Sequence, residues 1–308
     1  MSGGRRGVPA VLKRVSVRPA TALLVVALAL FGCANPTLRA RAYAQRNGMS
    51  AMSLQGTRFQ HEIFTKGAAK RATSKPDGTA DATVDSAMLY VFIEGDGSPW
   101  VDAGTRIAKD PTPHRALALE LAAATPHAVL YLGRPCYFAP RPETICTPDL
   151  WTSGRYSTDV VDSLAAAVAR YAAANDNPPL ILIGYSGGGA LAVLMAAQLP
   201  EVRAVITIAA NLDVDAWARW HRYLPLAASK NPATEAPLAE SILQWHLVGD
   251  KDDNVPESVN RRYFDTLRPD QVWRYPDFDH ACCWAEHWVS ILTRIEAAIT
   301  AGRTSSPW

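Results

Sequence analysis

The chain has 308 residues, of which 48% are hydrophobic and 19% charged, so it can bury a sizeable core as one large domain or two small ones. The formal net charge is +2, but residues 1–32 hold five cations and no acid, which leaves 26 basic against 29 acidic residues in the remainder. The body of the chain is therefore slightly acidic, and its charge gives no support to nucleic-acid binding.

The first 32 residues have the pattern of an export signal. A basic segment precedes the apolar run Thr21–Phe31, which is too short to span a bilayer comfortably. The run ends in LFGC, and the small residue before Cys33 resembles a bacterial lipoprotein signal, in which the cysteine carries lipid and becomes the new N-terminus. That resemblance implies a membrane anchor on Cys33, and Ala34 favours the outer membrane of a Gram-negative cell. An ordinary secretory signal and an uncleaved anchor are the alternatives.

Export makes disulfide bonds permissible. Once Cys33 is assigned to lipid, four of the five cysteines are left to pair. Cys136 and Cys146 lie in a proline-rich stretch, where a bridge would pin a long connection and contribute about 2–3 kcal/mol. The adjacent Cys282 and Cys283 would form a vicinal disulfide or stay as two thiols.

The order of the predicted elements indicates an α/β fold. Residues 33–56 are small, polar and aperiodic, so we expect a flexible tether before a domain over 57–308. Short apolar strands then alternate with amphipathic helices, which predicts a mostly parallel sheet with helices on both faces. The segment 211–241 breaks this rhythm and predicts a small cap or insertion. The expected strands are 57–65, 88–94, 128–133, 180–185, 202–210, 244–249 and 271–276, and the expected helices are 115–124, 158–174, 187–198, 257–267 and 284–301.

A glycine-rich motif stands at the junction of one expected strand and helix. GYSGG (184–188) fits G-x-S-x-G, with Ser186 as a candidate nucleophile on a sharp strand-to-helix turn. Gly184 and Gly188 would leave room for the close approach of the backbone at such a turn. The Gly187 N–H, at the positive end of the following helix, would face a developing oxyanion. A turn that only tightens packing and a phosphate-binding loop are the alternatives.

A serine hydroxyl needs a base, and the base needs an orienting acid. GDKDDNVP and YPDFDHACCW each follow an expected strand, so the chain has the order Ser…Asp…His. On these motifs residues 57–300 resemble the α/β-hydrolase superfamily. Its acid loop G-x-x-D-x-x-V-P corresponds here to Asp252, and its catalytic histidine to His280. The rival candidates are Asp250, Asp253 and His287.

The oxyanion hole needs a second donor. VFIEGDGSPW ends an expected strand where the family usually has His-Gly, and Glu94-Gly95 stands there instead. The backbone N–H of Asp96 is the candidate donor, with Gly97 next, and we expect the Asp96 carboxylate to point away from the oxyanion. An acidic turn without a catalytic role is the alternative.

The motifs IEGDG, RPC, GYSGGG and DHACCW together resemble exported bacterial α/β-hydrolases of poorly defined substrate. The resemblance implies a serine hydrolase that cleaves an ester, amide or peptide bond of a small-molecule, lipid or peptide acyl substrate through an acyl-enzyme at the cell envelope. No metal-ligand, P-loop or dinucleotide motif occurs, so we expect no metal or cofactor. A non-catalytic envelope lipoprotein that uses the fold for binding is the alternative. The candidate pocket residues are Trp100, Trp151, Trp217 and Trp220, in or near the loops 134–156 and 211–241.

Overall fold

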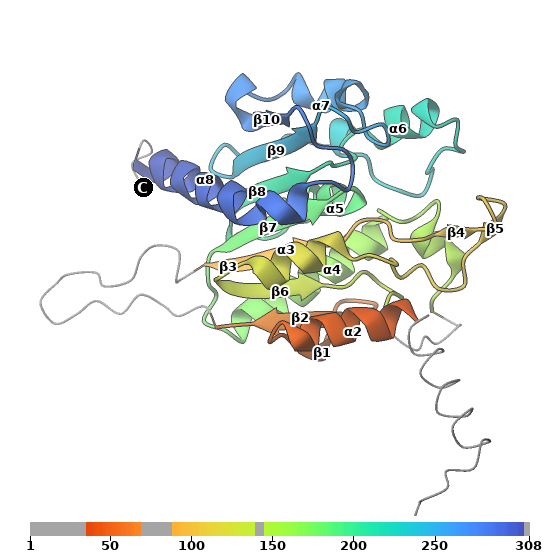
Figure 1. The fold of residues 1–308 in the computed structure, drawn as a ribbon, viewed down its shortest axis with the longest axis horizontal. Coiled ribbons are helices and arrows are strands. Elements are labelled where there is room, and N and C mark those ends of the chain that lie inside the picture. Colours follow the sequence, from red (N-terminus) through yellow and green to blue (C-terminus); the bar gives the residue numbers. More distant parts are fainter. Residues whose placement is uncertain (1–34, 69–87, 139–144, 305–308) are drawn as a thin grey trace, which may run out of the picture.

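An eight-stranded sheet forms the centre of the molecule (Figure 1). The computed structural model describes residues 35–68, 88–138 and 145–304. The strand order is β1-β2-β6-β3-β7-β8-β9-β10. β2 runs antiparallel to both of its neighbours, β1 and β6, and the six strands from β6 to β10 in this order are parallel to one another. The strands are β1 (Ser50–Gln55), β2 (Gln60–Lys66), β3 (Leu89–Ile93), β6 (Ala128–Leu132), β7 (Leu180–Tyr185), β8 (Val202–Ile208), β9 (Leu243–Gly249) and β10 (Val272–Tyr275).

Helices cover both faces of the sheet, because the buried strands alternate their side chains between two hydrophobic clusters. In β3, Tyr90 and Phe92 join the cluster with α2, α3 and α8, whereas Leu89 and Val91 join the cluster with α4 and α5. The predicted mostly parallel sheet with helices on both faces is confirmed. The helices are α2 (Pro36–Arg46), α3 (Leu117–Ala124), α4 (Thr158–Ala173), α5 (Gly187–Ala196), α6 (Val214–Trp220), α7 (Arg261–Phe264) and α8 (Trp284–Thr304), with short 3₁₀ turns at 148–151, 232–234, 257–260 and 269–271.

The expected tether over 33–56 is wrong from Pro36 onward. Asn35 caps α2 by accepting a hydrogen bond from the Leu38 N–H, and proline stands at the first helical position. The small side chains of Ala40 and Ala44 let α2 pack into the core. β1 then pairs with β2 along its whole length, so this segment is the edge of the sheet. Small residues served close packing here and did not mark a linker.

Two smaller segments lie outside the central sheet. The ribbon β4 (Trp100–Val101) and β5 (Arg106–Ile107) follows β3, and the expected insertion over 211–241 holds α6 and one 3₁₀ turn. Both lie on the side of the molecule toward which the parallel strands run, at the right of Figure 1. Cys33 and the leader lie outside the described residues, and none of the described helices is long and apolar enough to cross a membrane.

Candidate active site

Ser186 lies on a tight turn between β7 and α5. Its backbone has φ 52° and ψ −125°, a conformation that non-glycine residues rarely adopt and that is enriched at functional sites. A Cβ atom at Gly184 would overlap the carbonyl of Gly188, and one at Gly188 would overlap the carbonyl of Ile93. The two glycines therefore permit the close approach that the sequence predicted. The turn holds Ser186 in place through a hydrogen bond from its N–H to the Ile208 carbonyl.

Ser186, His280 and Asp252 form one hydrogen-bonded chain. Nε2 of His280 lies 3.1 Å from Oγ of Ser186, and Nδ1 lies 2.9 Å from Oδ2 of Asp252. The residues come from the ends of β7, β10 and β9, which are parallel strands and therefore end at one edge of the sheet. The structure thus brings together the three residues that the sequence selected. Their distances suit transfer of a proton from Ser186 to His280.

The acid is set apart from its rivals by burial. Asp252 is buried, and its second oxygen, Oδ1, accepts hydrogen bonds from the N–H groups of Asn254 and Val255. Asp250 and Asp253 are exposed and contact neither His280 nor Ser186 among the described residues. Asp252 is therefore the carboxylate fixed to orient the imidazole.

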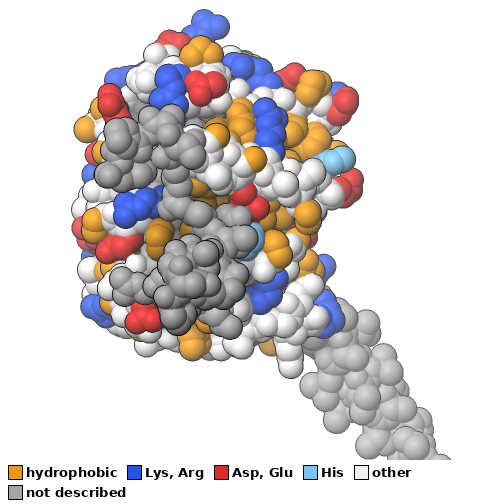
Figure 2. Space-filling view, turned by 90° about the vertical axis from the view of Figure 1, so that its left-hand side faces the viewer, with side chains coloured by type: hydrophobic (Ala, Val, Ile, Leu, Met, Phe, Trp, Pro, Cys, Tyr) orange, Lys and Arg blue, Asp and Glu red, His pale blue; other side chains and the backbone are white. Residues whose placement is uncertain are grey.

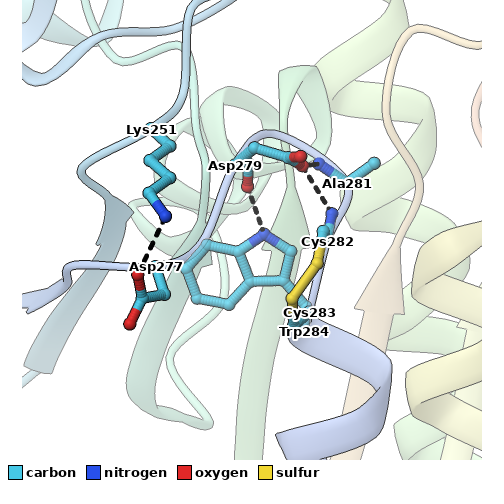
Figure 3. The surroundings of a disulfide bond; sticks show 7 residues. All are labelled: Lys251, Asp277, Asp279, Ala281, Cys282, Cys283 and Trp284. Carbon is cyan, nitrogen blue, oxygen red and sulfur yellow. Dashed lines mark hydrogen bonds and ion pairs between the residues drawn. A yellow bond between two sulfur atoms is a disulfide. The ribbon is translucent and has the colours of Figure 1, made fainter.

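The loop that carries His280 is held by its own side chains (Figure 3). The carboxylate of Asp279 accepts hydrogen bonds from the N–H groups of Ala281 and Cys282, and its carbonyl accepts one from the Trp284 indole. Cys282 and Cys283 form a vicinal disulfide directly before α8. These hydrogen bonds and the disulfide hold the backbone on both sides of His280. The rival His287 lies on α8, where its ring packs against Phe278.

A buried cluster of charged side chains lies next to the turn at Ser186, which we call the nucleophile turn after the candidate role of this residue. The carboxylate of Asp96 accepts from Arg134 at 2.5 Å, from Arg155 at 2.8 Å and from the Tyr156 hydroxyl at 2.7 Å. Burial alone would raise the pKa of the Asp96 carboxyl, but the charges of Arg155 and Arg134 and the hydrogen bonds hold this pKa well below its usual range. Asp96 is therefore ionised at neutral pH.

The carboxylate of Asp96 lies close to the turn at Ser186. A Cβ atom at Gly187 would overlap Oδ1 of Asp96, so the carboxylate lies against the Cα atom of Gly187. Its negative charge is offset by two guanidinium groups, of which that of Arg134 is 1% exposed. The cluster has a net charge of +1, and it fixes the backbone at Asp96.

Two backbone N–H groups remain available beside Ser186. Those of Asp96 and Gly187 donate to no other group in the described part of the chain, and they are the two donors that the sequence assigned to the oxyanion hole. The neighbouring Gly95 N–H is already used, because it donates to the side chain of Glu94.

Glu94 occupies the place of the family's usual histidine and is buried. Its carboxylate accepts hydrogen bonds from the N–H groups of Gly95 and Ala118, the second at the start of α3. Burial raises the pKa of this carboxyl to about 7, although both N–H groups favour the ionised form. Glu94 therefore ties the loop after β3 to α3, and its charge changes near neutral pH.

Ser186 and His280 open into a cavity of about 830 Å³, a size typical of sites for small organic ligands. The cavity is lined on one side by residues 94–100 and on another by Trp217 and residues 222–226. Trp100 and Trp217, two of the four candidate tryptophans, contribute to it. Trp151 is instead buried, and its indole N–H donates a hydrogen bond to the Ala108 carbonyl. Trp220 is exposed at the end of α6.

The remaining site predictions concern cysteines and metals. Cys136 and Cys146 form a disulfide with a Cα–Cα distance of 5.6 Å, the pairing that the sequence favoured. Arg134, two residues before Cys136, reaches Asp96, so this bridge lies close to the charge cluster along the chain. Among the described residues, no group of three or more His, Cys, Asp or Glu side chains is arranged to hold a metal ion.

A family profile described as the alpha/beta hydrolase fold matches residues 138–281, a range that contains all three residues of the hydrogen-bonded chain. This part of the chain is therefore similar to the α/β-hydrolase family, and the sheet around it has the α/β-hydrolase fold. No curated protein matches its sequence. The likeness to the family thus rests on this profile, and the solved structures below share the fold.

Three solved structures are similar to this chain in fold. A membrane phospholipase A, described as a bacterial virulence factor, is 17% identical with a TM-score of 0.51 and covers 90% of this chain and 97% of its own. An esterase domain from Rhodothermus marinus is 15% identical with a TM-score of 0.51, covering 81% and 96%. A Pyrococcus furiosus esterase is 13% identical with a TM-score of 0.51, covering 83% and 94%. At these identities the likeness shows the fold alone.

Sequence reasoning missed the partners of Asp96. Arg134 stands in the motif RPC and Arg155 follows the proline-rich loop, yet neither shows a local signal for burial. Arginine is seldom buried without a partner, and the partner here is 38 or 59 residues away. The only hint was the unusual acidic residue in the oxyanion loop, whose charge requires compensation.

Proposed function

We propose that this α/β hydrolase is a serine hydrolase that cleaves a carboxylic ester through an acyl-enzyme intermediate at the bacterial cell envelope. The observation that carries the proposal is the hydrogen-bonded chain Ser186–His280–Asp252 opening into a cavity of about 830 Å³. The buried acid, the strained nucleophile and the two available N–H groups all support the same reaction.

In the proposed mechanism, Nε2 of His280 takes the proton of Ser186 as Oγ attacks the ester carbonyl. Asp252 keeps the other nitrogen protonated and stabilises the imidazolium that forms. The N–H groups of Gly187 and Asp96 donate to the tetrahedral oxyanion. His280 then protonates the leaving alcohol, and in a second step it activates a water molecule that releases the acid and frees Ser186.

The cell-envelope location is proposed from the leader, in which an apolar run precedes Cys33. The two disulfides of the described structure support an oxidising compartment. We propose an ester as the substrate, and amides, peptides and thioesters are the other acyl compounds that this chemistry serves.

The test is labelling of the purified full chain with a fluorophosphonate probe, followed by a screen of esters of increasing acyl length. We expect labelling of the wild type, and none of Ser186→Ala or His280→Ala. His287→Ala is the matched control and should be labelled like the wild type, because His287 lies outside the hydrogen-bonded chain. A folded wild type that stays unlabelled would exclude the proposed enzyme and favour the alternative, a binding protein with the hydrolase fold.

A further inference from the structure

Exposed apolar side chains gather around the mouth of the cavity. Tyr223 and Leu224 line the mouth, and Leu224 is 88% exposed. Trp220, 56% exposed, lies three residues before Tyr223, and Trp100 pairs across the β4–β5 ribbon with Ile107. We call these five residues the apolar rim. A soluble protein rarely exposes such a group of large apolar side chains together unless the surface has a partner.

Other surfaces of the described structure differ from this rim. The remaining exposed large apolar residues are dispersed: Leu38 lies on α2, Met52 on β1, Ile145 in the proline-rich stretch and Val289 on α8. The side of the molecule opposite the rim, which faces the viewer in Figure 2, shows acidic and basic side chains scattered among apolar ones wherever described atoms are visible. The rim is therefore a local feature of the cavity mouth.

Cations accompany the rim. Arg222 lies between Trp220 and Tyr223 in the sequence, and Lys109 lies two residues after Ile107. Both side chains are exposed, and neither forms an ion pair with another described residue. Tryptophan, tyrosine and leucine combined with unpaired lysine and arginine is the composition that binds the interface of an anionic bilayer.

The N-terminal end of the described chain lies at this same mouth. α2 forms a groove along its length with residues 113–116, and Pro113, His114 and Arg115 also line the active-site cavity. In Figure 1 the start of α2 lies on the same side as β4, β5 and α6. In the sequence, Cys33 precedes Pro36, the first residue of α2, by only three residues. A lipid on Cys33, or the apolar run before it, would hold the mouth close to a membrane.

We propose that the apolar rim is a membrane-docking surface that lays the cavity mouth on an anionic bilayer, so that the substrate is a lipid ester that enters from the membrane. The substrate part rests on the proposed function, whereas the docking part does not. A bilayer is favoured over a protein partner because the start of α2, which closely follows the proposed lipid site in the sequence, lies on the same side of the molecule as the apolar side chains and the unpaired cations (Figure 1).

The docking test uses the full chain reconstituted in vesicles of phosphatidylcholine and phosphatidylglycerol. Nitroxide-labelled lipids quench tryptophan only on contact, so quenching reports whether Trp100 and Trp220 reach the bilayer. We expect quenching in the wild type and loss of most of it in the double variant Trp100→Phe, Trp220→Phe. Wild-type fluorescence that the labelled lipid leaves unchanged would overturn the proposal, and self-association through the rim would then assign it to a second copy of the chain.

The substrate test compares a long-chain ester embedded in the vesicles with a short water-soluble ester. Trp220→Ser and Ile107→Ser change exposed residues outside the cavity lining, and Val289→Ser, on α8 and 59% exposed, is the matched control. We expect each rim variant to lose at least about ten-fold on the vesicle ester and less than about two-fold on the soluble ester. Equal losses on both esters, or none on either, would contradict lipid entry through the rim. A wild type that is inactive on both esters would contradict the proposed function, and the quenching result would still show whether the rim contacts the bilayer.

Discussion

The carboxylate of Asp96 lies directly against Gly187, the residue after the proposed nucleophile, so that a Cβ atom at Gly187 would overlap Oδ1 of Asp96. The same Cβ atom would also overlap the Tyr156 hydroxyl. The nucleophile turn and the charge cluster are therefore fitted to each other. Any change of volume at this contact moves at least one of the two proposed oxyanion donors.

Gly187→Ala is expected to remove most of the activity. The added methyl group must displace Asp96 or the turn, and the loss of one oxyanion donor typically lowers the rate by roughly 100–1,000-fold. The measurement is kcat on a soluble ester, with the melting temperature as a check of folding. If kcat stays within about two-fold of the wild type in a folded variant, the contact does not position a donor.

Arg134→Met tests the compensation of the buried carboxylate. Removing one partner of a buried ion pair costs about 3–5 kcal/mol of stability. We expect a loss in this range together with a lower kcat, because only the Arg155 guanidinium then offsets the Asp96 carboxylate beside the oxyanion. The double variant Asp96→Asn, Arg134→Met should lose less stability than the sum of its single variants. Additive losses by urea unfolding would show that the two side chains are not coupled.

Glu94 is expected to make stability depend on pH. Its pKa is raised to about 7 by burial, above the value of about 4.3 of an exposed glutamate. The folded state therefore holds a proton that the unfolded state releases. The stability that this proton contributes is present below about pH 4 and is lost as the pH rises through 7, by roughly 4 kcal/mol at most.

The corresponding experiment measures the free energy of unfolding of the wild type and Glu94→Gln at pH 5 and pH 8. The variant cannot ionise, so we expect its stability relative to the wild type to be higher at pH 8 than at pH 5. Glu240→Gln, at an exposed position, is the control and should follow the wild type. A difference between Glu94→Gln and the wild type that does not change with pH would refute the shifted pKa.

Asp252→Asn and Asp253→Asn separate the two adjacent acids. In Asp252→Asn the side-chain amide would donate to Nδ1 of His280, which favours the tautomer that carries its proton on Nε2 and cannot take the proton of Ser186. We expect kcat to fall by roughly 10³–10⁴-fold with little change in KM. Asp253 is exposed and outside the hydrogen-bonded chain, so Asp253→Asn should keep its activity. Comparable losses in the two variants would contradict the assignment of the acid.

Sequence alone was sufficient for the centre of the fold, because there the signals are local. A short apolar strand, GYSGG and an apolar helix follow one another without a gap, and the strand and helix expected around Ser186 match β7 and α5. The order Ser…Asp…His then followed from the chain order of the strands.

The remaining features depend on contacts between distant segments. α2 was missed because it has few large apolar side chains and packs through alanines, although Asn35-Pro36 was a start signal. The pairing of Arg134 and Arg155 with Asp96 has no local pattern, because it arises only when the loops after β3 and β6 meet. The apolar rim likewise joins β4–β5 to α6, which are separated by more than a hundred residues.

The walls of the cavity are built apart from the sheet that supports it. The ribbon β4–β5 and the insertion that contains α6 contribute no strand to the central sheet. Their sequences can therefore vary while the sheet keeps Ser186, Asp252 and His280 in place. Loops carried on a rigid scaffold are where specificity commonly diverges. A library that randomises residues 98–107 and 220–226 would therefore explore new acyl preferences with little effect on folding. Related proteins with different substrates are expected to differ first in these two segments.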